Sequence, residues 1–437
     1  MYYFILILLY LFINYSIRAE DLHSNKNCVG NQKLKNIIQC VLDHSPEYRI
    51  AQGNLEASLG RRKIAGYAFP SNPNFSTTSA LRRGTRGENF SLNNSIPQAI
   101  NGELMLSQEI YIGGQREIKL ELAQADIKTK VKNVQAIERS TIAQTVHSVL
   151  LYQASWEEYK LTQELNSLSK EIAKIANLRF KNGIGAEMDS EIALSESIKM
   201  NSFEEQARRR WQDSKTDLVI MMGVRFQEEL NVFEERKILQ IPKEDLEKYI
   251  ELAEKRRPDL EVLELEIKYS KSKIKLLQRE RIPNLTISGY VQNDGFNEKV
   301  VGGKVSIPLQ IWRDNSGEIQ EAKANSRISE ENREIGGHTV RFEATKAWNG
   351  VDSWKRAWQN FPPNILERTN ENLLILKNAI ATGKISVKDA LLSQKSLVDL
   401  KSNYFQTKAN YAIACNEYLR AGGMDLNEFF LKDSNNE

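Results

Sequence analysis

The chain has few of the residues that support catalysis or metal binding. It contains four histidines, and these are scattered without the spacing of a zinc site: His23, His44, His147 and His338. No phosphate-binding loop, nucleophile elbow or CxxC motif is present. We therefore expect no enzymatic activity, no cofactor and no metal ligand set.

Long apolar runs are also scarce. Only residues 2–14 form such a run, and it is too short to span a bilayer as a helix. The small residue Ala19 follows, which predicts a signal peptide over residues 1–19, although the usual positive charge before the run is absent. No later stretch approaches 18 apolar residues, so no transmembrane helix is predicted.

The formal net charge is only +3, and no dense Lys/Arg stripe with interleaved aromatic residues occurs. This composition excludes nucleic acid as an expected partner. The apolar share of 41% and the charged share of 27% are ordinary for a folded chain.

Cysteine is rare, with three residues in the chain. In an exported protein Cys28 and Cys40 could form a disulfide; the alternative is two free thiols near a flexible end. Cys415 lies among apolar residues and is expected to be a buried thiol.

What the sequence does contain is an internal repeat. Residues 179–189 (RFKNGIGAEMD) align without a gap with residues 379–389 (AIATGKISVKD), so that Gly183 matches Gly383 and Asp189 matches Asp389. A period of about 200 residues covers nearly the whole chain and describes its architecture. We predict a first repeat over residues 20–243 and a second over residues 244–437.

Each repeat is predicted to contain two alternating strands and a long helical hairpin. The strands are expected at about 74–81 and 103–111, and at about 285–292 and 300–309. The hairpins have their tips near residues 183 and 383. Helices are also expected over residues 33–67 and 244–281, and Trp348, Trp354 and Trp358 are expected in the helical core.

The outgoing helix of the first hairpin, about residues 117–181, carries a coiled-coil seam. Its apolar residues are spaced by fours and threes: Leu161, Leu165, Leu168, Ile172 and Ile175. In the second repeat Pro362 and Pro363 predict a kink or restart that the first repeat lacks.

The strands have the length and alternation of outer membrane strands, but two hairpins in a small soluble sheet would have the same pattern. In lipid, four strands would leave open edges with unpaired backbone groups. Three copies would supply about twelve strands, enough for a barrel with a water-filled interior. The expected fold is therefore mainly α, with coiled-coil hairpins and four strands per chain contributing to a shared trimeric β-barrel.

The order of these elements and the two glycine tips resemble the TolC-type outer membrane efflux channels over about residues 35–425. Two pairs of segments resemble the cobalt-zinc-cadmium (CzcC-like) branch of this channel family. The first pair is Arg257-Pro258-Asp259-Leu260 with Arg281-Ile282-Pro283-Asn284-Leu285; the second is Ser306-Ile307-Pro308-Leu309 with Arg313-Asp314-Asn315-Ser316-Gly317-Glu318-Ile319.

This resemblance implies a homotrimer in outer membrane lipid with a helical tube in the periplasm. It also implies docking to a periplasmic adaptor (membrane fusion protein) and an inner-membrane RND-type pump, and passive passage of heavy-metal cations. The same duct could serve drugs or type I protein secretion, and a periplasmic scaffold without a pore is a further alternative. Ile385 stands where some members have a basic gating residue, so no salt-bridge latch is expected there.

The candidate sites lie at the tips. Asp189 and Asp389 could form a carboxylate ring at a pore constriction, or they could act as helix caps. Candidates for adaptor docking, as opposed to turn geometry alone, are Arg179, Gly183, Ile184, Gly383, Lys384 and Ile385. Candidates for an aromatic girdle, as opposed to ordinary packing, are Tyr111, Tyr290 and Trp312.

Overall fold

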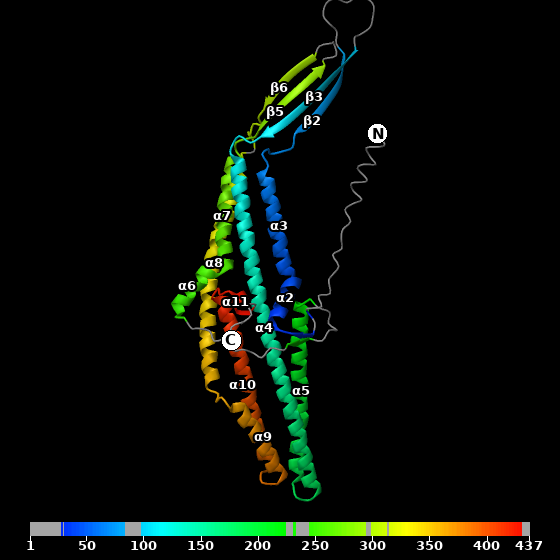
Figure 1. Cartoon of the computed structure of the whole chain (residues 1–437), viewed down its shortest axis with the longest axis vertical. Helices are drawn as coiled ribbons and strands as arrows, with labels where there is room; N and C mark the ends of the chain where they lie inside the picture. The colour runs from blue at the N-terminus through cyan, green and yellow to red at the C-terminus, as the bar shows by residue number, and fades with distance from the viewer. Residues whose placement is uncertain are drawn as a thin grey trace, which may run out of the picture.

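The protein is described by a computed structural model over residues 28, 30–83, 98–223, 230–232, 244–293, 299–312 and 314–430. The predicted signal peptide over residues 1–19 lies outside the described residues. The chain is elongated. A β-sheet lies at one end, and the turns of two helical hairpins lie at the other (Figure 1).

Four antiparallel strands form the sheet, in the order β2-β3-β5-β6. They are β2 (Asn74–Arg83), β3 (Gln98–Ile110), β5 (Leu285–Asn293) and β6 (Lys299–Ser306). The central pairing of β3 with β5 joins the two halves of the chain, as in the pair Met105 and Tyr290. The prediction of a mainly helical chain with a small four-stranded part is confirmed.

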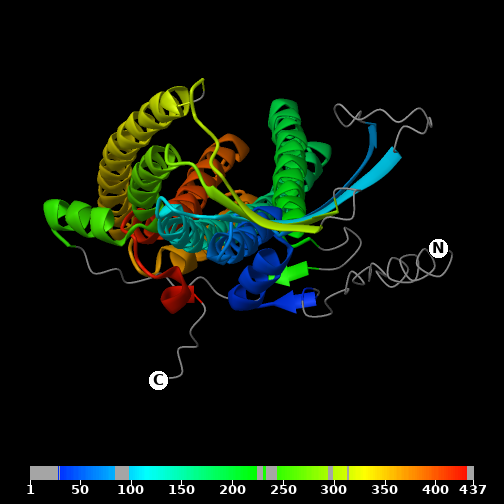
Figure 2. The ribbon, with the colours of Figure 1, turned by 90° about the horizontal axis from the view of Figure 1, so that it is seen from above.

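Below the sheet, four helices lie side by side along a curve (Figure 2). They are α3 (Pro46–Gly66), α4 (Gln115–Lys181), α7 (Pro258–Arg279) and α8 (Ser316–Gln359). The helix α3 packs on α4, α4 on α7, and α7 on α8, which leaves α3 and α8 at the two edges of this layer. Polar contacts between neighbouring helices join the layer, such as the 2.9 Å ion pair of Lys132 with Glu261.

The lower half is a bundle of two helical hairpins. The helix α4 has 67 residues, roughly 100 Å of helix, and returns as α5 (Glu187–Met221). The second hairpin consists of α9 (Ile365–Ala381) and α10 (Val387–Ala421). The two hairpins share an apolar core near their tips, built from Ile172, Ala176, Ala193, Leu376, Ile380, Val387 and Ala390.

Prolines divide three helical stretches. The break between α8 and α9 contains Pro362 and Pro363, as predicted. The expected helices over 33–67 and 244–281 are wrong as single elements. The first splits into α2 (Leu34–His44) and α3, and the second into α6 (Leu246–Arg256) and α7. Pro46 and Pro258 stand at the first positions of α3 and α7, because a proline lacks the N–H that would continue the preceding helix.

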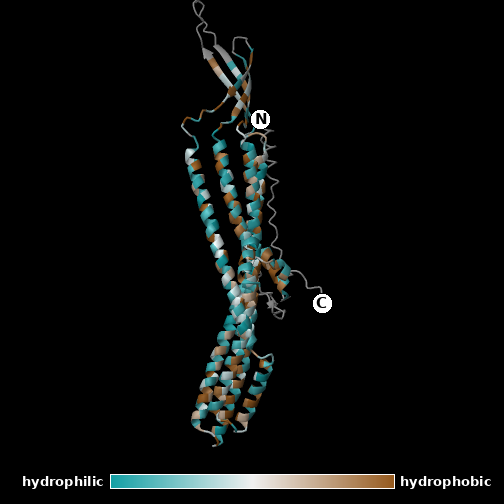
Figure 3. Cartoon of the chain, turned by 90° about the vertical axis from the view of Figure 1, so that its left-hand side faces the viewer, coloured by the Kyte–Doolittle hydropathy of each residue, from teal (hydrophilic) through white to brown (hydrophobic). Residues whose placement is uncertain are grey.

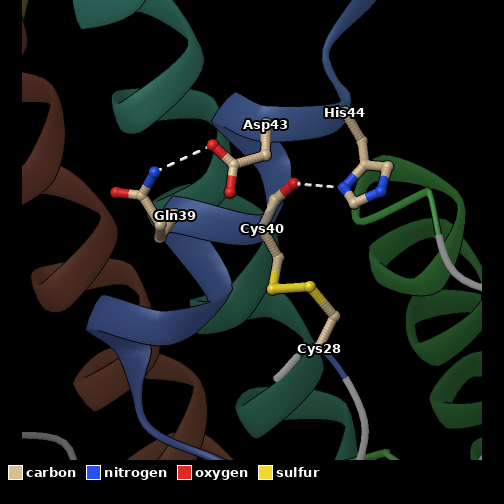
Figure 4. The surroundings of a disulfide bond; sticks show 5 residues. All are labelled: Cys28, Gln39, Cys40, Asp43 and His44. Carbon is tan, nitrogen blue, oxygen red and sulfur yellow. Dashed lines mark hydrogen bonds between the residues drawn. A yellow bond between two sulfur atoms is a disulfide. The ribbon is translucent and has the colours of Figure 1, made fainter. Parts of the chain in front are cut away.

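A disulfide joins Cys28 to Cys40 of α2 (Figure 4). Both cysteines lie in an apolar core that also contains Leu218 and Met222 of the first hairpin. The sequence left this pairing open. A short parallel pair, β1 (Gly30–Gln32) with β4 (Leu230–Val232), and α11 (Leu426–Phe430) were not predicted. Cys415 is buried, as predicted.

A charged cluster in the middle of the body joins α7, α8 and α10. Arg257 pairs with Asp259 at 2.6 Å and with Glu343 at 2.5 Å, and Glu343 also lies 3.4 Å from Arg420. Arg139 of α4 donates hydrogen bonds to the last carbonyls of α10, including that of Leu419 at 2.9 Å. Burial, together with the positive charges of Arg257 and Arg420, lowers the pKa of Arg139 to about 10.

Two of the three tryptophans expected in the helical core pack there. Trp348 and Trp358 contact the core that contains Tyr249 and Tyr418, whereas Trp354 is 37% exposed. The prediction was therefore wrong for Trp354, whose position on α8 turns its ring toward the surface. Within the described part of the chain, no helix combines the length and the apolar composition that a membrane span requires.

Candidate functional site: the hairpin tips and the open sheet

The two hairpins turn with the same backbone geometry. Gly183 and Gly383 have φ angles of 70° and 74°, in the left-handed region that glycine adopts without strain. Around Gly183, the amide of Ile184 donates to the carbonyl of Arg179 at 2.9 Å; around Gly383, the amide of Lys384 donates to that of Ala379 at the same distance. Each outgoing helix therefore ends in a Schellman motif.

Arg179 links the two tips. Its Nη1 donates a hydrogen bond to the carbonyl oxygen of Ile380 at 3.2 Å. Its guanidinium lies against Gly383, where an added Cβ would be 3.0 Å from Nη1. Arg179, predicted as an adaptor-docking residue, thus contacts the other hairpin of its own chain. The aligned position in the second tip is Ala379, so the repeat itself shows that only the first tip carries this arginine.

The matched aspartates have different surroundings. At the second tip, Ser386 is the N-cap of α10, and its Oγ accepts a hydrogen bond from the backbone amide of Asp389 at 3.0 Å. The same hydroxyl donates to Asp389 Oδ2 at 2.7 Å. At the first tip the N-cap is Ala186, which has no side-chain hydrogen bond to offer, and Asp189 is half-buried. Side-chain capping is therefore present only at the second tip, with Ser386 as the capping residue.

The tips also expose apolar side chains, and brown residues gather at this end in Figure 3. Ile184 is 69% exposed and Met188 is 67% exposed, whereas Ile385 is half-buried and packs against the core shared by the hairpins. Lys384 is exposed beside this surface. An exposed apolar patch with a nearby charge is typical of a protein-binding surface.

The sheet has one apolar and one polar face. Directly opposed residues share a face, and the cross-strand set Leu104, Val291 and Val301 is apolar, with exposed fractions of 52%, 50% and 79%. The neighbouring sets place Phe75 with Leu106, and Ile287 with Val305, on that same face. The other face is mainly polar and carries Glu103, Ser107, Glu109, Ser288, Gln292 and Lys304, with Met105, Tyr290 and Val300 among them.

No second layer covers the apolar face within the described part of the chain, because the large side chains along most of it are strongly exposed: Phe75, Leu104, Leu106, Ile287, Val291, Val301 and Val305. A small soluble sheet would bury such a face against other elements. The two edge strands are also open on their outer sides among the described residues. The strand β2 runs away from the helices and β6 runs toward them, so the two edges have opposite directions (Figure 1).

The three aromatic girdle candidates lie in different environments. Trp312, just beyond β6, is 90% exposed. Tyr290 covers Gly302, where an added Cβ would meet its ring at 2.5 Å, so it packs within the sheet. Tyr111 lies 5.2 Å from Lys119 Nζ, measured to the ring centroid. Trp312 is thus the most exposed of the three.

The structure shows no group of three or more His, Cys, Asp or Glu side chains that could hold a metal ion among the described residues. The tips offer exposed apolar side chains and carboxylates, and the sheet offers an exposed apolar face and two open backbone edges. Such features can bind partners and line a passage.

Residues 37–224 match the family of outer membrane efflux proteins. No curated protein matches the chain in sequence. Among solved structures, the Campylobacter jejuni CmeC outer membrane channel is similar over 89% of this chain and 85% of its own, with 16% identity and a TM-score of 0.73. The VceC outer membrane protein of Vibrio cholerae matches over 90% of this chain and 96% of its own, with 13% identity and a TM-score of 0.71.

A third similar structure is CusC, described in terms of folding and transmembrane channel formation. The similarity extends over 91% of this chain and 93% of the CusC chain, with 12% identity and a TM-score of 0.70. The chain has the fold of these outer membrane channels over nearly its whole described length.

Proposed function

We propose that this chain belongs to the outer membrane efflux protein family and that three copies form a passive duct through the outer membrane. The observation that carries the proposal is the exposed apolar face of the sheet, bounded by the two open edges of β2 and β6. The efflux family match over residues 37–224 and the shared channel fold support it.

Closure of the sheet follows from the cost of unpaired backbone groups in lipid, which is several kcal/mol for each group. A single chain has four strands with two open edges. Because the edges run in opposite directions, β6 of one copy can pair antiparallel with β2 of the next. Three copies give about twelve strands, with the apolar face toward lipid and the polar face toward a water-filled lumen.

The helical hairpins then form the periplasmic part of the duct, and their tips face the inner membrane. We assign the exposed tip residues Ile184 and Lys384, with the turns at Gly183 and Gly383, to contact with a periplasmic adaptor and, through it, an inner-membrane RND-type pump. Asp189 and Asp389 would lie at the narrow end, where three copies bring six carboxylates together and favour cations.

For the cargo we propose heavy-metal cations. The support is the resemblance of the segments around Arg257-Pro258-Asp259 and Arg281-Ile282-Pro283 to the cobalt-zinc-cadmium branch. Drugs or secreted polypeptides are the alternative cargo of the same duct. Passage needs no reaction in this chain, so the residues act by pore shape and charge.

The proposal is tested with the purified mature protein in detergent and in planar bilayers. We expect a particle mass three times that of one chain and stepwise ionic conductance. A stable monomer that is water-soluble without detergent, or bilayers that stay closed, would contradict the proposal. The cargo is tested separately by comparing metal and drug sensitivity of a deletion strain, complemented with the intact gene.

A further inference from the structure

Two hollows between the helices below the sheet differ in charge, although each has a volume of about 660 Å³. The ionisable side chains that line the first hollow are mostly acidic: Asp126, Glu266, Glu318, Glu321, Lys130 and Lys273. Among the described residues, the second hollow is lined by three basic side chains and no acidic one: Arg281, Lys323 and Arg327. The second hollow is termed the basic groove below, and the first the acidic hollow.

The two hollows lie on opposite sides of the contact between α7 and α8. Ser270 of α7 donates a buried hydrogen bond to Ser326 of α8 at 3.2 Å. Ser270 lines the acidic hollow, whereas Ser326 lines the basic groove. The acidic hollow is also lined by α4, through residues such as Asp126. Three neighbouring helices of a curved layer share a hollow on the concave side of the curve, so the basic groove opens on the convex side (Figure 2).

An exposed apolar segment lies beside the upper end of the basic groove. This segment connects β6 to α8 and includes Trp312, which is 90% exposed. Two hydrogen bonds attach the segment to the end of α7. Gln310 Nε2 donates to the carbonyl oxygen of Glu280 at 3.1 Å, and Arg281 Nε donates to that of Asp314 at 2.9 Å. Since Arg281 also lines the groove, the basic side chains begin where the apolar segment meets the helices.

The positive charges of the basic groove are largely uncompensated. Lys323 and Arg327 are exposed, and neither has an ion-pair partner in the part of the chain that the structure describes. The carboxylate of Glu330 on the same helix is bound by Lys271 at 2.9 Å. Arg281 is the one groove cation that lies near a described carboxylate, that of Asp314 at 3.9 Å. The groove therefore attracts an anion from outside the chain.

We propose that the basic groove binds the phosphate of an anionic glycerophospholipid, whose acyl chains lie along Trp312 and the apolar face of the sheet. Guanidinium groups bind phosphate oxygens in a bidentate way, and a basic pocket beside a membrane selects anionic headgroups. The inference rests on the proposed duct. In that duct the apolar face lies in lipid, the base of the sheet lies at the level of the headgroups, and the concave side of the helical layer faces the lumen.

The test offers phosphatidylglycerol and phosphatidylcholine in equal amounts to the purified mature protein in detergent, and native mass spectrometry measures the lipid that is retained. We expect about tenfold more phosphatidylglycerol on the wild type, and no preference in Lys323→Gln with Arg327→Gln. The matched control is Lys130→Gln with Lys273→Gln. It removes the same two charges from the acidic hollow and should keep the preference.

Competition with inorganic phosphate separates a lipid site from a site for a free anion. Excess inorganic phosphate should leave most of the phosphatidylglycerol in place, because the acyl chains also contribute to binding. Complete displacement by inorganic phosphate, equal retention of the two lipids by the wild type, or the same loss in both double variants would overturn the proposal. Unchanged melting temperatures of the two double variants exclude misfolding as the cause of a loss.

The outcome for this site is distinguishable from that for the duct. A trimer that conducts ions in planar bilayers but shows no preference for phosphatidylglycerol would overturn the lipid site alone. A chain that prefers phosphatidylglycerol through Lys323 and Arg327 but stays monomeric and does not conduct would overturn the duct and support the lipid site.

Discussion

The guanidinium of Arg179, in the turn of the first hairpin, donates a hydrogen bond to the backbone carbonyl of Ile380 in the second hairpin. The two residues are separated by 201 positions in the chain. Higher in the bundle, ion pairs such as Lys377 with Glu171 at 2.6 Å also join the hairpins. The contact of Arg179 lies at the turns themselves, and it joins the two tips of one copy.

Replacing Arg179 by Ala should loosen the tips. In the proposed duct the tips form the narrow end. At this half-buried position the charged donor contributes about 1 kcal/mol, so the balance between a closed and an open narrow end should shift about fivefold toward open. Single-channel records of the reconstituted protein measure this as a longer open time. The control is Lys181→Ala, an exposed residue of the same turn. Equal open times for the two variants would mean that the Arg179 contact does not restrain the tips.

The two turn glycines form a matched pair. Ala at either position must adopt a left-handed conformation, which costs about 1–2 kcal/mol. At Gly183 the added methyl meets open space, whereas at Gly383 it meets the Arg179 guanidinium at 3.0 Å. Both variants should lower thermal stability by a similar amount, but only Gly383→Ala should also lengthen open times. A long open time in Gly183→Ala would show that turn strain alone opens the duct.

Asp389 has two candidate roles that a pair of variants separates. Ser386→Ala removes the cap of α10 and should destabilise the protein by about 1 kcal/mol with its charge unchanged. Asp389→Asn removes the charge and should lower the preference of the channel for cations over anions, measured as a reversal potential in a salt gradient. An unchanged reversal potential in Asp389→Asn would leave only the role of supporting the cap.

The disulfide between Cys28 and Cys40 closes a short loop, with a sequence separation of 12. Replacing both cysteines by Ser should lower the free energy of unfolding by about 3 kcal/mol, because the unfolded chain gains freedom. Thermal unfolding followed by circular dichroism measures the change. Cys415→Ser serves as the control. Because burial raises the pKa of the Cys415 thiol to about 11, this thiol should also resist alkylation at pH 8 in the folded protein.

The charged cluster predicts a dependence on pH. Burial opposes ionisation of Asp259, but the Arg257 guanidinium outweighs it and holds the pKa of this carboxyl below its ordinary value of 3.8. The ion pair therefore stabilises the folded state above about pH 4, and this contribution is lost as the pH falls through the lower, folded-state pKa. Asp259→Asn should flatten the fall of the melting temperature between pH 5 and pH 3. Parallel curves for the variant and the wild type would assign that fall to other groups.

Much of the fold follows from local patterns. Alternation located β2, β3, β5 and β6, heptad spacing located α4, and the proline pair located the break before α9. The breaks before α3 and α7 also had a sequence signal, a proline at the first helical position, preceded in α3 by the capping residue Ser45. The pairing of β1 with β4 had no sequence signal, because each strand has only three residues and the two strands lie about 200 positions apart.

The candidate site was harder to predict than the fold. The repeat located both turns, because the glycine at each must have a positive φ. It did not show that Arg179 contacts Ile380, since that depends on how two hairpins far apart in sequence lie together. The repeat also did not show that Asp189 and Asp389 have different surroundings. They differ because the helix cap is Ala186 next to Asp189 and Ser386 next to Asp389.

The pairing of β3 with β5 has a consequence for biogenesis. Leu104 must find Val291, so nearly 190 residues have to be synthesised before the central ladder can form. Ladders between distant segments form slowly, and until then both strand pairs present bare edges that favour aggregation. For the proposed outer membrane duct, escort by a chaperone through the periplasm should matter most during the interval between the emergence of the first and the second strand pair.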